Sequence, residues 1–376
     1  MAVPGGLDDD GVMVTLSESW YARPAAREAV IRTEPSGARE FHRTLPGYAA
    51  TPLVDLPHLA EELGVGRVLL KDESRRLGLP AFKILGASWA VAQVLARRVG
   101  TRADLTELRG ARDIAGVQLV TATDGNHGRA VARMAAMVGA SATVFVPAVM
   151  TERAAGAIAG EGAEVVRVEG DYDAAVSAAA WHAGADDATR VLVQDTAWEG
   201  YTEVPAWIVE GYRTMLVEID EELGAQPGMV VVPVGVGSLA EAVVRHYRRE
   251  GHQRTRLLSV EPETAACALA SLTADGLRRV ETGDTIMAGL SCGTVSATAW
   301  PVLHDALDAA VAVSDDETRR AMADLAGAGV VAGPSGAATL AGLRAALADP
   351  ARRESLALAP DATVVLLVTE GPTGVE

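Results

Sequence analysis

The sequence is short of the residues that build covalent or metal-based scaffolds. Its 376 residues include only two cysteines, Cys267 and Cys292, and three phenylalanines. Two cysteines cannot supply a disulfide framework or a cysteine-based metal site, so we expect no metal and interpret both as reduced, small hydrophobic residues. Hydrophobic residues still make up 49% of the chain, which is typical of a globular protein with a substantial core.

Positive charge is scarce as well. The chain has 33 basic and 50 acidic residues, which gives a net charge of −17. Nucleic acids and anionic membranes bind basic surfaces, so we expect neither as a partner. Apolar runs such as residues 229–236 are too short to span a bilayer, and the amino terminus lacks the basic-then-apolar pattern of a signal peptide. We therefore expect a cytoplasmic enzyme.

Lysine and asparagine are rarer still. Lys71 and Lys83 are the only lysines, every other basic residue is arginine, and Asn126 is the only asparagine. Arginine serves as well as lysine at a solvated site, but it does not release its proton or form a Schiff base. Two lysines among so many arginines therefore suggest that an amine is needed at these positions. A solvated lysine that had simply not been replaced by arginine would look the same in the sequence.

Short apolar runs alternate with alanine-rich amphipathic stretches and predict an α/β fold of two or three domains. The predicted strands are residues 67–71, 117–121, 142–146, 164–168, 191–194, 229–234, 257–260 and 363–368. The predicted helices are residues 85–99, 128–138, 172–182, 208–223, 239–250, 315–328 and 336–348. Uninterrupted apolar strands between helices are typical of mostly parallel sheets covered on both faces, and ligands bind beyond the carboxyl ends of such strands.

The first polar turn of interest surrounds the two lysines. Lys83 follows Gly78-Leu79-Pro80-Ala81-Phe82 and stands at the start of a predicted helix. The positive end of the helix dipole disfavours an ammonium there, which predicts a lowered pKa for Lys83, suited to a nucleophile. Phe82 could form a flat apolar wall for a planar ligand, or it could be ordinary core. Lys71 precedes two acids, Asp72 and Glu73, and we predict that it forms an ion pair that fixes this loop.

The second turn reads Thr121-Ala122-Thr123-Asp124-Gly125-Asn126-His127-Gly128. Its glycines permit close backbone approach, and free N–H groups at a helix start favour an anionic group such as a carboxylate. Asn126 could donate a hydrogen bond to a phenolate-like oxygen, and Asp124 could transfer a proton. The same residues could equally form a simple capped turn, with His127 as a packing residue.

The third turn, Gly235-Val236-Gly237-Ser238-Leu239-Ala240, predicts a phosphate site made by backbone amides. It also matches a dinucleotide-binding pattern, for which Glu261 would be the ribose-binding acid of a nicotinamide-dependent oxidoreductase. That alternative leaves the lysines and the asparagine unexplained. Pyridoxal phosphate accounts for an amine, an aromatic wall, a hydroxyl partner and a phosphate loop together.

Six segments resemble those of diaminopropionate ammonia-lyases. They are Lys71-Asp72-Glu73-Ser74, Gly78-Leu79-Pro80-Ala81-Phe82-Lys83, Thr121-Ala122-Thr123-Asp124-Gly125-Asn126-His127-Gly128-Arg129, Gln194-Asp195-Thr196-Ala197-Trp198-Glu199-Gly200-Tyr201, Thr285-Ile286-Met287-Ala288-Gly289-Leu290 and Thr369-Glu370-Gly371. The resemblance begins near Phe41 and implies a tryptophan-synthase-like, fold type II pyridoxal-phosphate enzyme. Serine and threonine dehydratases belong to the same group, but they usually carry serine where this chain has Asp124.

The resemblance implies a set of cofactor contacts. Lys83 would form the Schiff base, Phe82 would lie against the pyridine ring, and Asn126 would bond the ring hydroxyl. Ser335 would face the ring nitrogen. The phosphate would bind to the backbone of the third turn, at Gly235, Val236, Gly237, Ser238 and Leu239.

The resemblance also implies a substrate, 2,3-diaminopropionate, which is converted through an aminoacrylate to pyruvate and ammonia. Lys83 and Asp124 would remove the α-proton from the L- and D-enantiomers respectively, and Asp195 would recognise the β-ammonium. The predicted substrate contacts are Ser74, Thr123, Asp124, Gly125 and Asp195.

The same resemblance implies the domain organisation. We expect an amino-terminal arm over residues 1–50, a large cofactor-binding domain over residues 51–87 and 203–376, and a small inserted domain over residues 88–202. Enzymes of this group are usually homodimers. Cys267 and Cys292 lie in segments that resemble the site entrance, where a disulfide is a minor hypothesis.

Several positions depart from the family pattern and leave the substrate open. Pro334 stands in the family's usual Gly-Glu-Ser-Gly segment, so we expect an acid near the ring to be missing. Pro80 replaces an asparagine, Glu241 could repel a phosphate, and the tail at Gly371-Pro372-Thr373-Gly374 lacks an acid. A related lyase or dehydratase for another β-substituted amino acid is the alternative, and a non-catalytic cofactor-binding relative is a more distant one.

Overall fold

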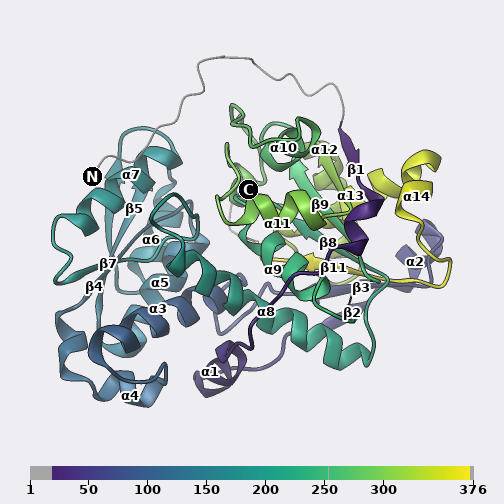
Figure 1. Ribbon diagram of the computed structural model, residues 1–376. Helices are drawn as coiled ribbons and strands as arrows, with labels where there is room; N and C mark the ends of the chain where they lie inside the picture. The colour runs from purple at the N-terminus through teal and green to yellow at the C-terminus, as the bar shows by residue number, and fades with distance from the viewer. Residues whose placement is uncertain (1–18, 253, 373–376) are drawn as a thin grey trace.

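Two sheets organise the structure, a computed structural model that describes residues 19–252 and 254–372. Figure 1 shows the smaller sheet and its helices on the left and the larger sheet on the right. The larger sheet has the strand order β1-β10-β9-β8-β11-β3-β2, and the smaller has β6-β5-β4-β7. All pairings are parallel except those of β1 and β2, the two edge strands of the larger sheet.

The strands of the larger sheet come from both ends of the chain. They are β1 (Trp20–Ala22), β2 (Leu53–Asp55), β3 (Arg67–Asp72), β8 (Met229–Pro233), β9 (Arg256–Pro262), β10 (Ala309–Val313) and β11 (Thr363–Val368). The smaller sheet is continuous in sequence and consists of β4 (Gln118–Ala122), β5 (Ser141–Pro147), β6 (Glu164–Val168) and β7 (Arg190–Leu192).

Helices cover both sheets. They are α1 (Ala38–Thr44), α2 (Pro57–Leu63), α3 (Lys83–Val99), α4 (Leu105–Gly110), α5 (Asn126–Val138), α6 (Glu152–Ala159), α7 (Tyr172–Gly184), α8 (Glu203–Leu223), α9 (Ser238–Tyr247), α10 (Cys267–Thr273), α11 (Ala299–Ala306), α12 (Asp315–Gly327), α13 (Pro334–Ala348) and α14 (Pro350–Leu356). Three short 3₁₀ helices are η1 (Pro24–Glu28), η2 (Arg112–Gly116) and η3 (Ala288–Leu290). No helix of the described residues is long and apolar enough to cross a bilayer.

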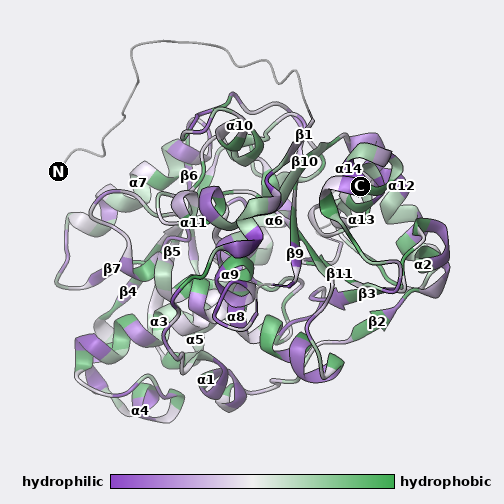
Figure 2. Cartoon of the chain, turned by 45° about the vertical axis from the view of Figure 1, so that its right-hand side comes forward, coloured by the Kyte–Doolittle hydropathy of each residue, from purple (hydrophilic) through white to green (hydrophobic). Residues whose placement is uncertain are grey.

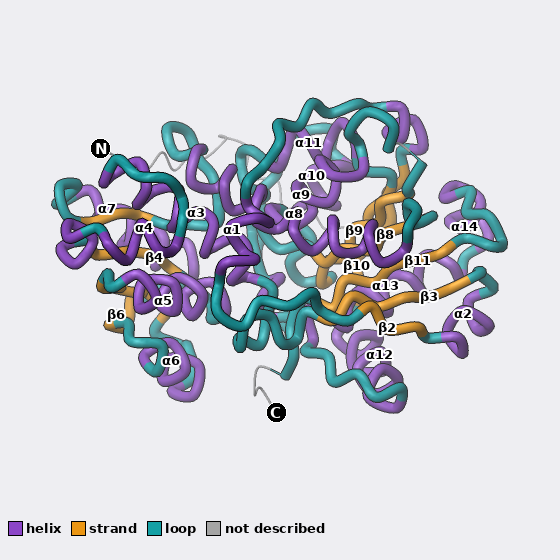
Figure 3. The backbone as a smooth tube through the Cα atoms, turned by 90° about the horizontal axis from the view of Figure 1, so that it is seen from below, coloured by secondary structure: helices purple, strands orange, loops and turns teal. Residues whose placement is uncertain are grey.

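The alternation of side chains along a strand explains why helices cover both faces of the larger sheet. Val230 and Val232 on β8 belong to the core shared with α8 and α9, whereas Met229 and Val231 belong to the core shared with α13. Successive side chains of a strand point to opposite faces, so an unbroken apolar run needs helices on both sides. Figure 3 shows α8 and α9 on one side of this sheet and α12 on the other. In Figure 2, β9 and β10 have the green of hydrophobic residues, whereas a surface helix such as α2 alternates between hydrophobic green and hydrophilic purple.

Close packing of α3 against α8 joins the two sheets. A Cβ atom at Gly86 on α3 would lie 2.5 Å from the Tyr212 ring, and one at Gly211 on α8 would lie 2.4 Å from the Leu85 carbonyl oxygen. Glycine at both positions lets the helix backbones approach. Because α3 also packs on α5, the start of α3, where Lys83 lies, is fixed relative to both sheets.

The predicted α/β fold with mostly parallel, helix-covered sheets is confirmed. Each predicted strand and helix overlaps one in the structure, with ends displaced by a few residues. Strands β1, β2 and β10 and the short helices α1, α2, α4, α6, α10, α11 and α14 were not predicted. The boundaries at residues 87 and 203 stay a prediction, and residues 1–18 of the predicted arm lie outside the described residues.

Candidate functional site

A cavity of about 740 Å³ lies where loops from both sheets meet. Loops that follow β3, β4, β8 and β11 line it, so it lies beyond the carboxyl ends of parallel strands. All the predicted site residues contribute to its lining: Ser74, Phe82, Lys83, Thr123, Asp124, Gly125, Asn126, Asp195, Gly235, Val236, Gly237, Ser238, Leu239 and Ser335. The structure therefore brings together every one of them, from segments far apart in sequence.

Lys83 is engaged in an ion pair at the start of α3. Its Nζ donates to Asp195 Oδ2 at 2.7 Å, its side chain is 24% exposed, and Nζ lies 5.4 Å from the centre of the Phe82 ring. Burial lowers the pKa of Lys83, but the Asp195 carboxylate raises it further, so the net shift is upward. The predicted lowering by the helix dipole is wrong, because a carboxylate in direct contact outweighs the dipole.

Asp195 is the polar centre of the site. Besides Lys83, its carboxylate accepts hydrogen bonds from the Tyr172 hydroxyl and the Gln194 side chain, both at 3.3 Å, and its backbone carbonyl accepts one from Ser238 Oγ at 2.6 Å. Burial would raise the pKa of Asp195, and the Lys83 charge holds it well below its ordinary value. Asp195 is therefore a carboxylate in a site already built to bind an ammonium group. Tyr172, at the start of α7, was not predicted.

Asp124 faces the same cavity without an ion-pair partner among the described residues. Its side chain is exposed to the cavity. Partial loss of solvation inside the site, with repulsion from Asp195, raises the pKa of Asp124 to about 7, although Lys83 opposes the shift. A carboxyl group that titrates near neutral pH can accept and release a proton under ordinary conditions.

The turn that carries Asp124 depends on glycine and threonine. Gly125 has φ of 150°, which L-residues rarely adopt. The Thr123 hydroxyl accepts hydrogen bonds from the N–H groups of Gly125 at 2.9 Å and Gly128 at 3.1 Å. His127 is a buried packing residue whose Nε2 lies 2.8 Å from the Val193 carbonyl oxygen. The turn is thus both a capped structure and part of the cavity wall, which joins the two interpretations of its sequence.

The loop after β8 presents backbone amides at the start of α9. Gly237 has φ of 92°, and a Cβ atom at Gly235 would lie 2.9 Å from the Gly289 carbonyl oxygen. Glycine therefore lets this loop turn tightly and pack against Gly289, which leaves its backbone amides at the start of α9 for an anion. Glu241 does not repel such an anion, because its carboxylate binds Arg245 at 2.8 Å and Thr298 at 3.1 Å and is absent from the cavity lining.

Asn126, Ser335 and Glu370 meet in another part of the cavity wall. Asn126 Nδ2 donates to Glu370 Oε2 at 2.7 Å, and the Ser335 N–H donates to Glu370 Oε1 at 3.3 Å. Ser335 Oγ is buried and has no hydrogen-bond partner among the described residues. The expectation that this region lacks an acid is wrong, because Glu370 arrives from the end of β11. Of the tail, Thr373 and Gly374 lie outside the described residues.

The dinucleotide alternative fails at its acid. Glu261 is fully buried and accepts hydrogen bonds from the N–H groups of Ala268 at 2.8 Å and Leu269 at 2.7 Å, at the start of α10. Burial raises its pKa to about 7, and it does not line the cavity. Glu261 is therefore a buried helix-capping acid, and the prediction of a ribose contact is wrong.

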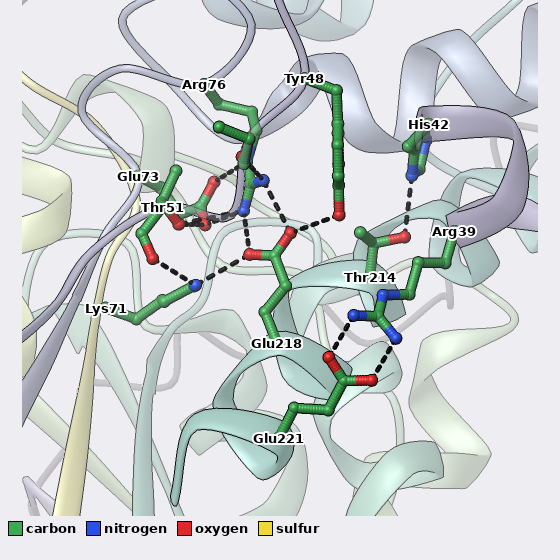
Figure 4. A network of polar contacts seen from close by, with 11 residues as sticks. Arg39, His42, Tyr48, Thr51, Lys71, Glu73, Arg76, Thr214, Glu218 and Glu221 are labelled. Carbon is green, nitrogen blue, oxygen red and sulfur yellow. Dashed lines mark hydrogen bonds and ion pairs between the residues drawn. The ribbon is translucent and has the colours of Figure 1, made fainter. Parts of the chain in front are cut away.

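The other lysine has a structural environment. Lys71 Nζ donates to the Thr51 carbonyl oxygen at 2.7 Å and forms an ion pair with Glu218 at 2.8 Å (Figure 4). Its acidic neighbours bind elsewhere: Glu73 pairs with Arg76, and Asp72 accepts the Ser74 N–H. The prediction of an ion pair is confirmed, but its partner is on α8 and not beside Lys71 in the sequence.

We call Lys71, Glu73, Arg76 and Glu218 the Arg76 network. Their charged side chains are at most 1% exposed, and Arg76 binds both Glu73 at 2.6 Å and Glu218 at 2.7 Å. Figure 4 shows Glu73 and Glu218 bound to the Arg76 guanidinium, with Lys71 bound to Glu218. The network ties the end of β3 and the loop that leads to Lys83 onto α8.

The two cysteines are free and buried. Cys292 lines the cavity, and Cys267 Sγ lies 3.6 Å from the Gly235 carbonyl oxygen. Burial raises the pKa of both thiols. The hypothesised disulfide is not formed in this structure, as expected from the first interpretation of the two residues.

Residues 44–370 match the family model described as "Pyridoxal-phosphate dependent enzyme". The chain belongs to this family. It is 36% identical over 355 residues to the diaminopropionate ammonia-lyase of Escherichia coli K12, which covers 90% of this chain and 88% of the relative. It is 40% identical over 291 residues to the Salmonella typhimurium enzyme of the same name, covering 73% and 71%. The crystal structure of the Escherichia coli enzyme in complex with D-serine superposes with a TM-score of 0.81 at 34% identity, covering 90% of this chain and 88% of that one.

The cavity of this pyridoxal-phosphate enzyme offers groups that fit the cofactor. Pyridoxal phosphate carries an aldehyde, a ring hydroxyl, a pyridine nitrogen and a phosphate. The cavity lining supplies an amine at Lys83, an amide at Asn126 and an unpartnered hydroxyl at Ser335. The glycine loop before α9 supplies backbone amides without room for side chains. The residues present therefore could hold every polar group of the cofactor.

Proposed function

We propose that this protein is an ammonia-lyase that uses pyridoxal phosphate to convert 2,3-diaminopropionate to pyruvate and ammonia. One observation carries the substrate: Asp195 already holds the Lys83 ammonium at 2.7 Å inside a cavity that Asp124 also lines. A substrate with a β-ammonium needs such a carboxylate. The diaminopropionate ammonia-lyases similar to this chain support the same substrate.

The proposed roles divide the site between cofactor and substrate. When bound, pyridoxal phosphate supplies an electron sink for the α-carbon. Lys83 holds its aldehyde carbon, Phe82 lies against its ring, and Ser335 faces the ring nitrogen. Asn126 bonds the ring hydroxyl. The backbone of residues 235–239 binds the phosphate.

Substrate residues act on the two ends of the amino acid. Asp195 binds the β-ammonium, which leaves as ammonia, and the turn at Thr123 and Gly125, with Ser74, receives the α-carboxylate. The Lys83 amine removes the α-proton of the L-enantiomer. Asp124, on the other face, removes that of the D-enantiomer, for which its pKa of about 7 is suitable.

We also propose the wider organisation that this family suggests. The chain forms a homodimer in the cytoplasm, and residues 88–202 form a small domain that closes on the large one, residues 51–87 and 203–376. The smaller sheet lies within residues 88–202. The larger sheet lies within residues 51–87 and 203–376, except for β1 in the arm, which supports the division.

The cofactor and substrate can be tested in two steps. The purified protein is expected to absorb at roughly 410–430 nm when loaded with pyridoxal phosphate. Pyruvate release should then be faster from L- and D-diaminopropionate than from serine and threonine, as measured by a coupled dehydrogenase assay. A protein that stays colourless would contradict the cofactor role. Preference for serine or threonine would contradict the substrate and favour a dehydratase.

Asp124→Asn should separate the two enantiomers. We expect pyruvate release from D-diaminopropionate to fall by about 10²- to 10⁴-fold, because the proton acceptor is lost, while the L-enantiomer is affected far less. In the unsubstituted protein, kcat/KM for the D-enantiomer should rise with pH through about 7, since the carboxyl must be ionised to accept a proton. Equal losses for both enantiomers would contradict this role.

A further inference from the structure

Glu370 is held in place by backbone hydrogen bonds on both sides. The Phe82 N–H donates to the Thr369 carbonyl oxygen at 3.1 Å, and the Gly371 N–H donates to that of Pro80 at 2.9 Å. The Gly333 N–H donates to the Glu370 carbonyl oxygen at 2.9 Å. The segment after β11 is therefore fixed between the loop that ends at Lys83 and the start of α13.

The Glu370 side chain connects a residue at the start of α5 with one at the start of α13. Glu370 is 6% exposed and lines the cavity, and its carboxyl accepts hydrogen bonds from Asn126 Nδ2 and the Ser335 N–H. A Cβ atom at Gly333 would lie 2.4 Å from the Gly371 carbonyl oxygen and 3.0 Å from Glu370 Cγ. Glycine at residue 333 therefore lets the start of α13 pack directly on the backbone that carries Glu370.

The contact with Asn126 has a consequence for the amide. An asparagine side chain has one acceptor atom and one donor atom with two hydrogens, and it can turn either toward a ligand. A carboxylate only accepts, so Glu370 must bind Nδ2 and thereby decides the orientation of the Asn126 amide. The second hydrogen of Nδ2 stays available as a donor. A phenolate-like ring oxygen requires a donor at that point.

The contact with Ser335 concerns the start of α13. Pro334, the first residue of this helix, has no N–H and no acidic side chain. Glu370 takes the Ser335 N–H and so contributes the acid that the proline position cannot supply. In pyridoxal phosphate one ring carbon separates the nitrogen from the carbon that bears the hydroxyl, so the residues that hold these two groups must be close, as Asn126 and Ser335 are through Glu370.

We propose that Glu370 is a positioning residue of the cofactor site, which fixes the Asn126 amide as a hydrogen-bond donor to the ring hydroxyl and holds Ser335 beside the ring nitrogen. This inference rests on the pyridoxal-phosphate chemistry of the proposed function, but it does not depend on which amino acid is the substrate. Glu370 acts through its two neighbours and takes no proton from the substrate.

The test measures cofactor binding and colour in addition to activity. Apoprotein of each variant is titrated with pyridoxal phosphate, and the dissociation constant and the absorbance maximum are recorded across pH. For Glu370→Ala we expect affinity to fall by about ten- to a hundredfold, the size of a lost hydrogen bond to a charged group, together with a displaced absorbance maximum. Glu370→Gln should keep most of the affinity, because its amide oxygen can still accept from Asn126.

Two further variants make the test specific. In an Asn126→Ala background, Glu370→Ala should lower the affinity for pyridoxal phosphate much less than it does alone, because the contact through which Glu370 acts is already gone. Glu261→Gln removes another buried acid, outside the cavity, and should leave the absorbance maximum and the affinity unchanged. Circular dichroism of each apoprotein checks folding. If Glu370→Ala does not fold, Glu370→Met, which fills similar space without an acceptor, and its double variant with Asn126→Ala give the same comparison.

The results that would contradict the role of Glu370 differ from those that would contradict the proposed function. Unchanged affinity and absorbance in Glu370→Ala, or in Glu370→Met where only that variant folds, would overturn the proposal, as would full additivity with Asn126→Ala. The failure of the proposed function looks different: the unsubstituted protein would then stay colourless or release no pyruvate from diaminopropionate. A protein that binds the cofactor but prefers serine would leave the role of Glu370 intact.

Discussion

Lys83→Ala and Lys83→Arg are both expected to lose pyruvate formation by at least about a thousandfold, together with the absorbance at roughly 410–430 nm. Alanine removes both the charge and the amine that contact Asp195 at 2.7 Å. Arginine retains a cation opposite Asp195 but cannot form a Schiff base. The pair of variants therefore separates the electrostatic role of residue 83 from its covalent role.

Two measurements check this expectation. Pyruvate release is followed with L-diaminopropionate, and the loaded protein is reduced with borohydride and digested to find the labelled peptide. The label should be on Lys83 in the unsubstituted protein and on neither variant. If Lys83→Arg kept substantial activity, an ion pair with Asp195 and not a covalent bond would be the function of the lysine.

Glu218→Gln is expected to lower the free energy of unfolding by about 3–5 kcal/mol. The change leaves Lys71 and Arg76 buried with one carboxylate fewer, and the charged groups of the Arg76 network are at most 1% exposed. A buried cation that loses its partner keeps its desolvation cost without the compensating attraction. Because the loop that leads to Lys83 depends on Arg76, cofactor binding should weaken as well.

Helix α8 supplies the matched control. Glu203 lies on the same helix and pairs with Arg97, but the two side chains are 62% and 57% exposed. Glu203→Gln should therefore change stability by less than about 1 kcal/mol in the same urea titration. Equal losses in the free energy of unfolding of the two variants would show that burial of the Arg76 network adds nothing to its stabilising effect.

The Arg76 network also predicts a dependence of stability on pH. Burial opposes the shift, but Arg76 and Lys71 lower the pKa of Glu218 to about 2 from its ordinary 4.5. A lowered pKa means that the stabilisation from Glu218 is fully present above about pH 4.5 and is lost as the pH falls toward 2. Glu218→Gln should remove this part of the acid dependence, which can be measured by urea titrations between pH 2 and 6.

The sequence was informative where function depends on local chain geometry. Lys83, Asn126 and the glycine loop at residues 235–239 each follow a predicted strand, and parallel strands deliver their following loops to one edge of the sheet. Their convergence in one cavity followed from the predicted fold. Unpredicted elements were those with weak local signals, such as the alanine-rich β10 and the three-residue strands β1 and β2.

The charges of the site could not be predicted in the same way. The Asp195 carboxylate raises the pKa of Lys83. Asp195 is 112 residues away in sequence, so this contact could not be predicted from the local chain. Glu370 is 244 residues from Asn126, and Glu218 on α8 pairs with Lys71 on β3. A dipole at a helix start can be predicted from the chain alone, whereas a carboxylate brought into contact by the tertiary fold cannot.

The burial of Lys71 makes this protein unusually simple to label. Its amine is fully buried, so Lys83, at 24% exposure, is the one lysine that reagents can reach. Amine-directed reagents would then report on the functional cavity alone, apart from the terminal amino group, and they would need alkaline conditions because the Asp195 carboxylate raises the pKa of Lys83. The stoichiometry of such labelling counts competent sites per chain, and protection from it measures their occupancy.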